Sequence, residues 1–114
     1  KTTDALGEKD GRRNMPRFKP ENISHNAALL ASLEAMARDK GVTVSQLALA
    51  WLHAQGQDIF PIPGTKRVAY LEQNVAALQV ALTPSEAQAL AQGFAPGAAA
   101  GTRYPEPAMK SLGI

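Results

Sequence analysis

The chain has 114 residues, of which 45% are hydrophobic and 19% are charged, and its formal net charge is +2. This length fits one domain, and the composition is that of a globular protein rather than a disordered one. The small net charge excludes a surface devoted mainly to polyanions, although it leaves room for a local basic site. The chain contains no cysteine, so it uses neither disulfides nor thiolates.

The sequence carries no sign of a membrane segment or of a secretion signal. No apolar run comes near the roughly 20 residues that a membrane helix needs, and the first residues lack a hydrophobic signal region. We therefore expect no membrane partner. The absence of cysteine is compatible with a reducing cytosol, and we expect a cytoplasmic protein. The first residue is Lys1 rather than Met, so we expect this chain to be part of a longer one.

Residues 1–21 are polar and contain glycines at positions 7 and 11 and prolines at positions 16 and 20. These residues interrupt helices, so we expect an irregular loop. The loop carries a basic cluster at Arg12, Arg13, Arg17 and Lys19. On sequence grounds this cluster is a solvated face of the loop.

Residues 22–56 are predicted to form two helices. The first covers residues 22–40 and is followed by Gly41, which suits a left-handed cap. The second begins at Thr43, which stands three residues before Gln46 in the pattern of a capping box. Along both helices, apolar residues recur at the three- and four-residue spacing of a helix with one buried face.

Residues 59–64 read Ile-Phe-Pro-Ile-Pro-Gly. The apolar residues favour one short buried strand, although the two prolines cannot donate hydrogen bonds to a sheet. One strand makes no sheet, so its backbone groups need partners that this chain does not contain.

Two further helices are predicted after this strand. Residues 67–78 repeat apolar side chains at helical spacing. Residues 83–92 begin with Thr-Pro-Ser-Glu, a capping box with proline at the first helical position. Residues 95–114 are rich in glycine, alanine and proline, and we expect an extended loop there. The chain by itself is thus expected to be mainly helical, with one short strand.

The stretch Pro-Ile-Pro-Gly-Thr-Lys-Arg at residues 61–67 has the features of an anion site. Gly64 lets the backbone approach a ligand closely, and the helix that follows presents free amide groups and the positive end of its dipole. Thr65 adds a hydroxyl donor, and Lys66 and Arg67 add two cations. The alternative is an ordinary turn before an exposed basic helix, because so short a motif is weakly specific.

Three polar side chains follow on the same predicted helix. Tyr70, Gln73 and Asn74 lie one to two turns beyond the cations. Their ring and amides are suited to contact a purine or a ribose. We therefore expect these side chains to extend the anion site into a nucleotide site.

Several stretches of the sequence together form a recognisable set. They are Arg-Asn-Met-Pro-Arg-Phe at 13–18, Gln-Leu-Ala-Leu-Ala-Trp-Leu at 46–52, Gln-Gly-Gln-Asp-Ile at 55–59, Pro-Ile-Pro-Gly-Thr-Lys at 61–66, Leu-Glu-Gln-Asn at 71–74 and Gly-Thr-Arg-Tyr-Pro at 101–105. With this set, residues 11–106 resemble the C-terminal region of aldo-keto reductases.

This resemblance implies that the chain is a fragment of the (β/α)8 TIM barrel of that family. Residues 1–21 would then be the loop after the seventh strand. Residues 59–64 would be the eighth strand, and residues 67–78 the eighth barrel helix. The site after the eighth strand binds phosphate in many barrels.

The resemblance also implies a function, namely NADP(H)-dependent reduction of a small-molecule aldehyde or ketone. It assigns Lys66 and Arg67 to the adenosine 2′-phosphate, with Thr65 donating beside them. Gln73 and Asn74 match the adenine contacts of the family, although many members have Glu where this chain has Gln73. Some members have Arg where this chain has Tyr70.

The resemblance implies no catalytic residue in this chain. The Asp, Tyr, Lys and His set of the family lies on earlier strands, so we expect the isolated chain to be inactive. For His25 and His53 we expect structural or surface roles, and for Trp51 a place in the core. We expect no metal site. The resemblance places the loop of residues 1–21 near the cofactor, where one of its cations would meet the pyrophosphate.

Two other interpretations belong to different classes of protein. The first is a non-catalytic helical fragment or interaction module that self-associates. The second is a helix-turn-helix protein, because two predicted helices flank Gly41. The second helix, however, presents Leu, Ala and Trp rather than the Arg, Asn and Gln that read base edges. We therefore expect no nucleic-acid partner.

Overall fold

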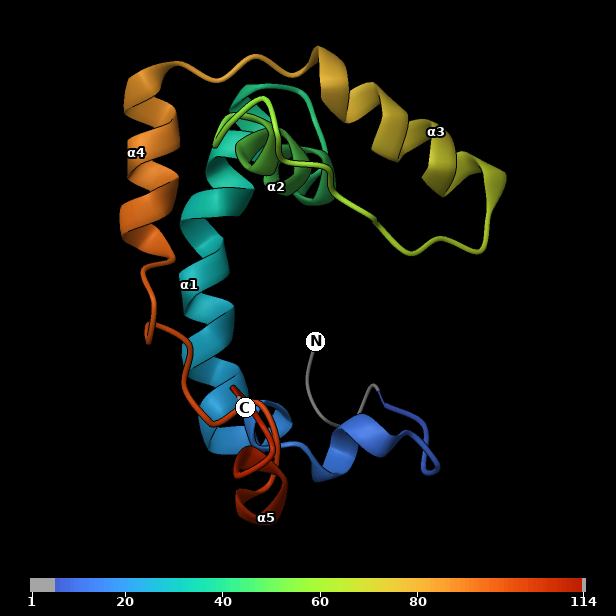
Figure 1. The fold of residues 1–114 in the computed structure, drawn as a ribbon, viewed down its shortest axis with the longest axis vertical. Coiled ribbons are helices and arrows are strands. Elements are labelled where there is room, and N and C mark those ends of the chain that lie inside the picture. The colour runs from blue at the N-terminus through green and yellow to red at the C-terminus, as the bar shows by residue number, and fades with distance from the viewer. Residues whose placement is uncertain (1–5, 114) are drawn as a thin grey trace. The chain divides into compact units, whose positions relative to one another are not determined.

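The structure is a computed structural model that describes residues 6–113. It contains the 3-10 helices η2 (Gly11–Asn14), η3 (Pro16–Phe18) and η4 (Ala77–Gln79) and the α-helices α1 (Pro20–Asp39), α2 (Val44–His53), α3 (Val68–Ala76), α4 (Pro84–Gly93) and α5 (Glu106–Met109) (Figure 1). None of these helices is long and apolar enough to cross a membrane. The chain divides into two compact units, Ser32–Gly93 and the residues on either side of it.

The helix α1 begins at a proline that the sequence led us to regard as a helix breaker. Pro20 is the first residue of α1, and Pro16 is the first residue of η3. A proline is tolerated there because the first amide of a helix has no partner within the helix. The end of α1 agrees with the prediction, since Gly41 has a φ of 67° and the Val42 amide donates to the Ala37 carbonyl at 2.9 Å.

The predicted capping boxes of α2 and α4 are both present. In α2 the Gln46 amide donates to Thr43 Oγ1 at 3.2 Å, and the Thr43 amide donates to Gln46 Oε1 at 2.9 Å. In α4 the Glu86 amide donates to Thr83 Oγ1 at 3.3 Å, and the Thr83 amide donates to Glu86 Oε2 at 2.7 Å. Each box provides partners for two amides that would otherwise lack them at a helix start.

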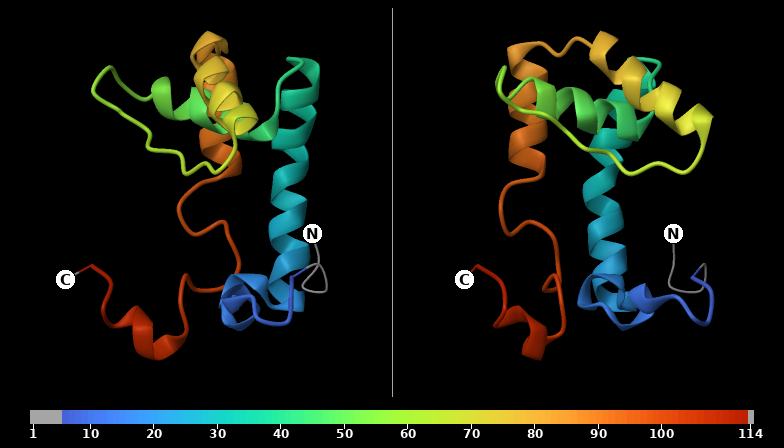
Figure 2. Two further views of the ribbon diagram at one scale, coloured as in Figure 1. Left: turned by 90° about the vertical axis from the view of Figure 1, so that its right-hand side faces the viewer. Right: turned by 45° about the vertical axis from the view of Figure 1, so that its right-hand side comes forward.

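The core of the unit Ser32–Gly93 lies where α1, α2 and α4 meet. Its buried residues are Leu33, Ala37, Leu47 and Leu90, and Trp51 packs against them, as the sequence predicted. The indole Nε1 of Trp51 also donates to the Ala87 carbonyl of α4 at 3.0 Å. Figure 2 shows α4 beside the end of α1 that belongs to this unit.

The prediction of a short strand at residues 59–64 is wrong for this structure. No strand occurs between residues 6 and 113, and residues 59–64 belong to no helix either. The side chains of Phe60 and Ile62 are 82% and 96% exposed, so the predicted burial is also wrong. The physical reason is that a strand forms only against a neighbouring strand, and the prolines at 61 and 63 remove two of the donors that would pair.

The prediction of an extended loop for residues 95–114 is wrong at one point, because residues Glu106–Met109 form the short helix α5. Pro107 lies in its first turn, where the fixed φ of proline suits a helix. Glu106 lies in the same turn, where its negative charge interacts favourably with the positive end of the helix dipole.

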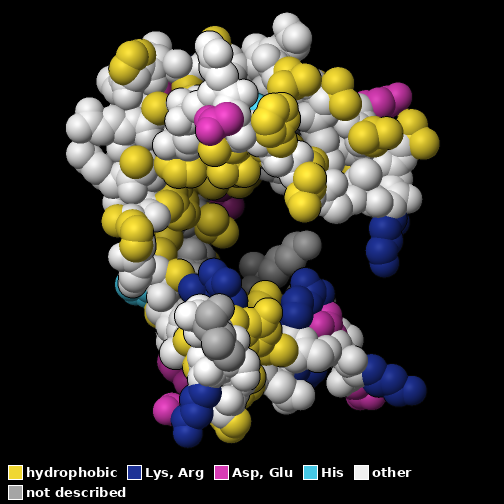
Figure 3. Space-filling model, in the orientation of Figure 1, with side chains coloured by type: hydrophobic (Ala, Val, Ile, Leu, Met, Phe, Trp, Pro, Cys, Tyr) yellow, Lys and Arg dark blue, Asp and Glu magenta, His cyan; other side chains and the backbone are white. Residues whose placement is uncertain are grey.

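The helix α3 lies largely on the surface of its unit. It contains no buried residue, and Val68, Leu71 and Val75 are more than half exposed. Figure 3 shows hydrophobic side chains on the surface around α3, at the upper right of the view. The first buried side chain after the start of α3 is Ala77, in the 3-10 helix η4 that continues it.

Candidate anion-binding site

The segment that the sequence singled out lies directly before α3. Residues 64–67 form no regular element, and Arg67 is the N-cap of α3 with an extended backbone. The amides of Val68 and Ala69, in the first turn, donate no hydrogen bond among residues 6–113. Free amides at a helix start and the positive end of its dipole favour an anion. The start of α3 therefore has amides without a partner, and anion binding there stays a prediction.

Thr65 is bonded to the start of α3 rather than free. Its hydroxyl donates to the Arg67 carbonyl at 3.1 Å, and it accepts from the Arg67 amide at 3.5 Å. The same carbonyl accepts from the amides of Tyr70 and Leu71. Thr65 thus shapes the entry to the helix, and its hydroxyl would have to rotate in order to donate to a ligand.

Lys66 and Arg67 are two exposed cations at the positive end of α3. Neither forms an ion pair within the part of the chain that the structure describes. The guanidinium carbon of Arg67 lies 5.7 Å from the centre of the Tyr70 ring, which is a cation–π distance. The positive charge of this segment is therefore not neutralised by a neighbouring carboxylate.

The three residues predicted to contact the nucleotide, Tyr70, Gln73 and Asn74, occupy adjoining positions on α3. Arg67, Tyr70 and Asn74 follow each other at intervals of three and four residues, which places them on one side of it. Gln73 lies beside them and is exposed, whereas Asn74 is half-buried. The structure thus brings the cations, the ring and the amides of the predicted nucleotide site together on one helix and its N-cap.

Gly64 has no conformational role of its own in this structure. Its φ is not positive, and a Cβ atom built on it would meet nothing within 4 Å. Its predicted close approach to a ligand therefore stays a prediction.

The basic loop of residues 11–19 belongs to the other unit, and its arginines are engaged there. Arg12 forms an ion pair with Asp10 and lies over the Phe18 ring at 5.8 Å, and Arg13 Nη1 donates to the Leu6 carbonyl at 2.7 Å. Arg17 Nε donates to the Gly101 carbonyl at 3.3 Å. The arginines are exposed, as a solvated face of the loop requires, and each is also bonded within its unit.

The two histidines take no part in the candidate site. His25 Nε2 lies 3.1 Å from the Ala98 carbonyl, and His53 is the half-buried last residue of α2. No group of three His, Cys, Asp or Glu residues between residues 6 and 113 is placed to hold a metal ion.

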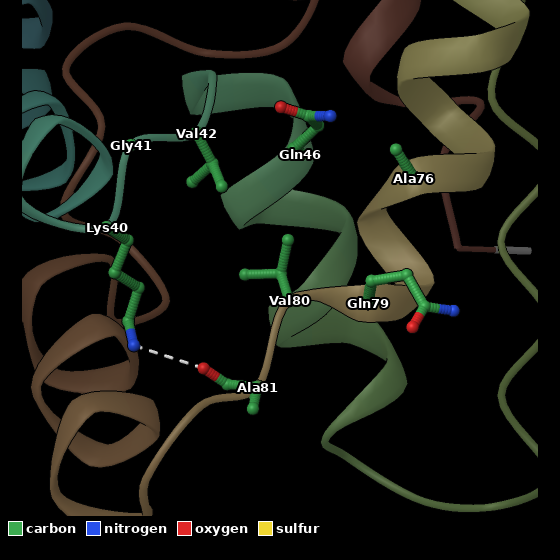
Figure 4. A pocket seen from close by; sticks show the side chains of 8 residues that line it. All are labelled: Lys40, Gly41, Val42, Gln46, Ala76, Gln79, Val80 and Ala81. Carbon is green, nitrogen blue, oxygen red and sulfur yellow. Dashed lines mark hydrogen bonds between the residues drawn. The ribbon is translucent and has the colours of Figure 1, made fainter.

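Sequence reasoning missed a link between α2 and the candidate site. Gln46 Nε2 donates to the carbonyl oxygen of Gln73 at 3.1 Å, across 27 positions of the sequence. Beside this contact lies an open cavity of about 360 Å³, lined by residues that include Lys40, Gln46 and Gln79 (Figure 4). The only indication of this link in the sequence is the residue type at position 46. Glutamate would also complete the capping box, but only glutamine has an NH2 group that can donate to a second partner.

The cavity itself carries no free charge for a ligand. The Nζ atom of Lys40 donates to the Ala81 carbonyl at 3.0 Å, as the dashed line in Figure 4 shows. The same atom forms an ion pair with Glu86 at 2.8 Å. The cations of the candidate site, which form no ion pair among residues 6–113, therefore lie at the start of α3 and not in the cavity.

Comparison with known proteins gives a single family. Residues 2–93 match the family model described as the aldo/keto reductase family. The chain is 44% identical over 105 residues to aldo-keto reductase yakc of Schizosaccharomyces pombe, whose name specifies NADP(+). The match covers 92% of this chain and 31% of that protein, so the chain spans about a third of the length of this relative. No solved structure matches the chain.

Proposed function

Because the chain belongs to the aldo/keto reductase family, we propose that it is part of an NADP(H)-dependent oxidoreductase that reduces aldehydes or ketones. Its contribution is the binding site for the adenosine 2′-phosphate end of the cofactor. The relative in Schizosaccharomyces pombe carries NADP(+) in its name, which supports the choice of cofactor.

The observation that carries this proposal is the pair of cations before α3. Lys66 and Arg67 are exposed and form no ion pair between residues 6 and 113. They stand next to the free amides of the first turn, as a phosphate site at a helix start requires. NADPH differs from NADH by the 2′-phosphate, so these cations would favour NADPH. Tyr70, Gln73 and Asn74, further along α3, would contact the adenosine that both cofactors share.

The fold we propose for the complete protein is a (β/α)8 barrel, with this chain as its C-terminal part. Residues 59–64 would be the eighth strand, and α3 with η4 the eighth helix. The exposure of Phe60 and Ile62 supports this, because in a barrel the side chains of a strand are covered by the packed interior or by the outer helices. The carbonyl substrate and the hydride donor would meet outside this chain, at the C-terminal face of the barrel.

In this scheme the chain holds the cofactor but carries out no chemistry. The bound cofactor supplies the hydride for the carbonyl carbon. The acid that protonates the carbonyl oxygen would come from the Asp, Tyr, Lys and His set of earlier strands. Gly64 through Arg67 would bind the phosphate, and α3 would orient the adenosine.

The experiment that tests the proposal compares the full-length parent with the isolated chain. The parent is expected to oxidise NADPH when it is given an aldehyde or a ketone. The isolated 114-residue chain is expected to show no turnover, because it lacks a general acid for the carbonyl. Turnover by the pure isolated chain would contradict this division of roles.

Self-association of the chain is a second candidate function. The observation that favours it is the large exposure of Phe60 and Ile62, at 82% and 96%. Apolar side chains exposed next to unpaired backbone groups promote association between chains. If the isolated chain is oligomeric and the reductase parent is monomeric, this association is a property of the isolated chain alone.

A further inference from the structure

Gln46 uses both ends of its side-chain amide. Its Oε1 accepts from the Thr43 amide at 2.9 Å and from Thr43 Oγ1 at 3.1 Å, which closes the capping box of α2. Its Nε2 donates to the Gln73 carbonyl of α3 at 3.1 Å. Between residues 6 and 113, this is the one side-chain hydrogen bond that joins α2 to α3.

The Gln73 carbonyl does not have its usual helical donor, the amide four residues on. In a regular α-helix it would accept from the amide of Ala77, but that amide turns to the carbonyls of Asn74 and Val75 as the helix tightens into η4. Gln46 therefore supplies a partner for one of the last carbonyls of α3, in the manner of a C-terminal cap.

Both α3 and its continuation η4 pack against α2, and the buried side chain of this interface lies on η4. The helix α3 has no buried side chain, and its nearest buried residue is Ala77 of η4. The cavity of about 360 Å³ lies between Gln46 on α2 and Ala76 at the end of α3, so part of this interface is not packed (Figure 4). Where packing is sparse, a single hydrogen bond has a large influence on where the helix lies.

We propose that Gln46 is a positioning residue for the adenosine end of the cofactor site. This role rests on the proposed function, because Gln73 and Asn74 are the residues that would contact adenine. Gln46 fixes the part of α3 that carries them. It does so from a distance, through the Gln73 carbonyl, and does not itself touch the cofactor.

The residue type is decisive for this role. A glutamate at position 46 would keep the two hydrogen bonds to Thr43 and so keep the capping box. Its carboxylate would have no hydrogen to donate to the Gln73 carbonyl, and two oxygens would then face each other. Gln46→Glu therefore removes the link to α3 while the start of α2 remains intact.

The test is a set of titrations of the full-length parent with NADPH and with NADH. Gln46→Glu is expected to weaken both dinucleotides by the same factor, roughly twofold to tenfold, the range of one net hydrogen bond. The equality follows because adenine is common to the two. The kcat at saturating NADPH is expected to stay unchanged, since the chemistry is not touched, and Tm is expected to fall only by the contribution of the one hydrogen bond that is lost.

The matched control is Gln79→Glu. Gln79 lines the same cavity and is exposed, and its side chain forms no hydrogen bond between residues 6 and 113. This control adds the same negative charge beside α3 and is expected to leave both affinities unchanged. Equal losses in the two variants would mean that charge alone acts, and would overturn the role of Gln46.

The outcomes separate this inference from the function on which it rests. A parent that binds NADPH but is unaffected by Gln46→Glu overturns the positioning role alone. A parent that binds neither dinucleotide overturns the proposed function together with this role. A loss confined to Tm, with both affinities retained, assigns Gln46 to stability and also overturns the inference.

Discussion

Asn26 and Ala100 are joined by two hydrogen bonds that run in opposite directions. Asn26 Nδ2 donates to the Ala100 carbonyl at 3.1 Å, and the Ala100 amide donates to Asn26 Oδ1 at 2.8 Å. The next residue, Gly101, has a φ of 83°, and a Cβ atom there would lie 2.7 Å from Asn22 Nδ2 and 2.9 Å from the carbonyl carbon of Pro16. The tail is thus fastened to the first part of α1 and lies close to Pro16 of the basic loop, within one unit.

Gly101→Ala is expected to release the tail from this loop. The left-handed backbone alone costs about 1–2 kcal/mol with alanine, and the clash with the Pro16 backbone adds to it. Gly97→Ala is the matched control, because Gly97 has a φ of 88° but nothing within 4 Å of its Cβ position. Hydrogen exchange of the Ala100 amide measures the release. Equal protection of this amide in both variants would contradict the account.

The carboxylate of Glu86 is expected to contribute to stability in a defined pH range. The hydrogen bond from Lys40, and then the one from the Thr83 amide, lower the pKa of Glu86 from 4.5 to about 2. Because the pKa is lower in the folded chain than in the unfolded one, the stabilisation is complete above about pH 4.5 and is lost as the pH falls toward 2.

Glu86→Gln is therefore expected to flatten the dependence of unfolding free energy on pH below 4.5. Urea denaturation at a series of pH values measures this slope. The carboxylate of Asp10, whose pKa Arg12 also lowers to about 2, titrates in the same range in both proteins, so the comparison isolates Glu86. Glu72→Gln, at an exposed position of α3, is the control and should keep the wild-type slope. An unchanged slope in Glu86→Gln would argue against the ion pair.

Trp51→Phe is expected to destabilise the unit Ser32–Gly93 by about 1 kcal/mol, the net contribution of one hydrogen bond. Phenylalanine keeps most of the ring that packs against the core but loses the donor to the Ala87 carbonyl. Circular dichroism during urea unfolding measures the change, because Trp51 is the only tryptophan of the chain and fluorescence would lose its signal. A stability equal to that of the wild type would show that the hydrogen bond contributes nothing.

The isolated chain is expected to self-associate through the apolar segment around Phe60 and Ile62. Both side chains are largely exposed, and the double variant Phe60→Ser, Ile62→Ser removes their apolar surface. Sedimentation velocity should show a lower average mass for the double variant than for the wild type. The same double variant should destabilise the full-length parent, where we propose that a barrel covers these residues. An isolated wild-type chain that stays monomeric would contradict the first expectation.

The features that could be predicted from the sequence depend on residues close together in the chain. The capping boxes of α2 and α4 and the glycine cap of α1 involve partners within five positions, so local patterns identify them. The segment of cations before α3 was predicted for the same reason, since a helix start and its preceding residues are local features.

The features that were missed or wrong depend on distant residues. The strand at residues 59–64 required a neighbouring strand, which none of the residues 6–113 supplies. The link from Gln46 to Gln73 spans 27 positions, and the pair of hydrogen bonds between Asn26 and Ala100 spans 74. Such contacts follow from how helices pack together, and no spacing in the sequence records them.

Titration of the Lys66→Ala variant of the full-length parent with NADPH and with NADH measures whether Lys66 binds the 2′-phosphate. A charge-assisted contact with the 2′-phosphate is worth about 1.5–3 kcal/mol, or roughly tenfold to a hundredfold in affinity. We expect NADPH binding to weaken by that factor while NADH binding stays nearly unchanged. Asn74→Ala, in contrast, should weaken both dinucleotides similarly, and Lys110→Ala, at an exposed lysine of the other unit and outside the loop of residues 1–21, should weaken neither. Equal changes of the two affinities in Lys66→Ala would contradict the assignment of the phosphate to this residue.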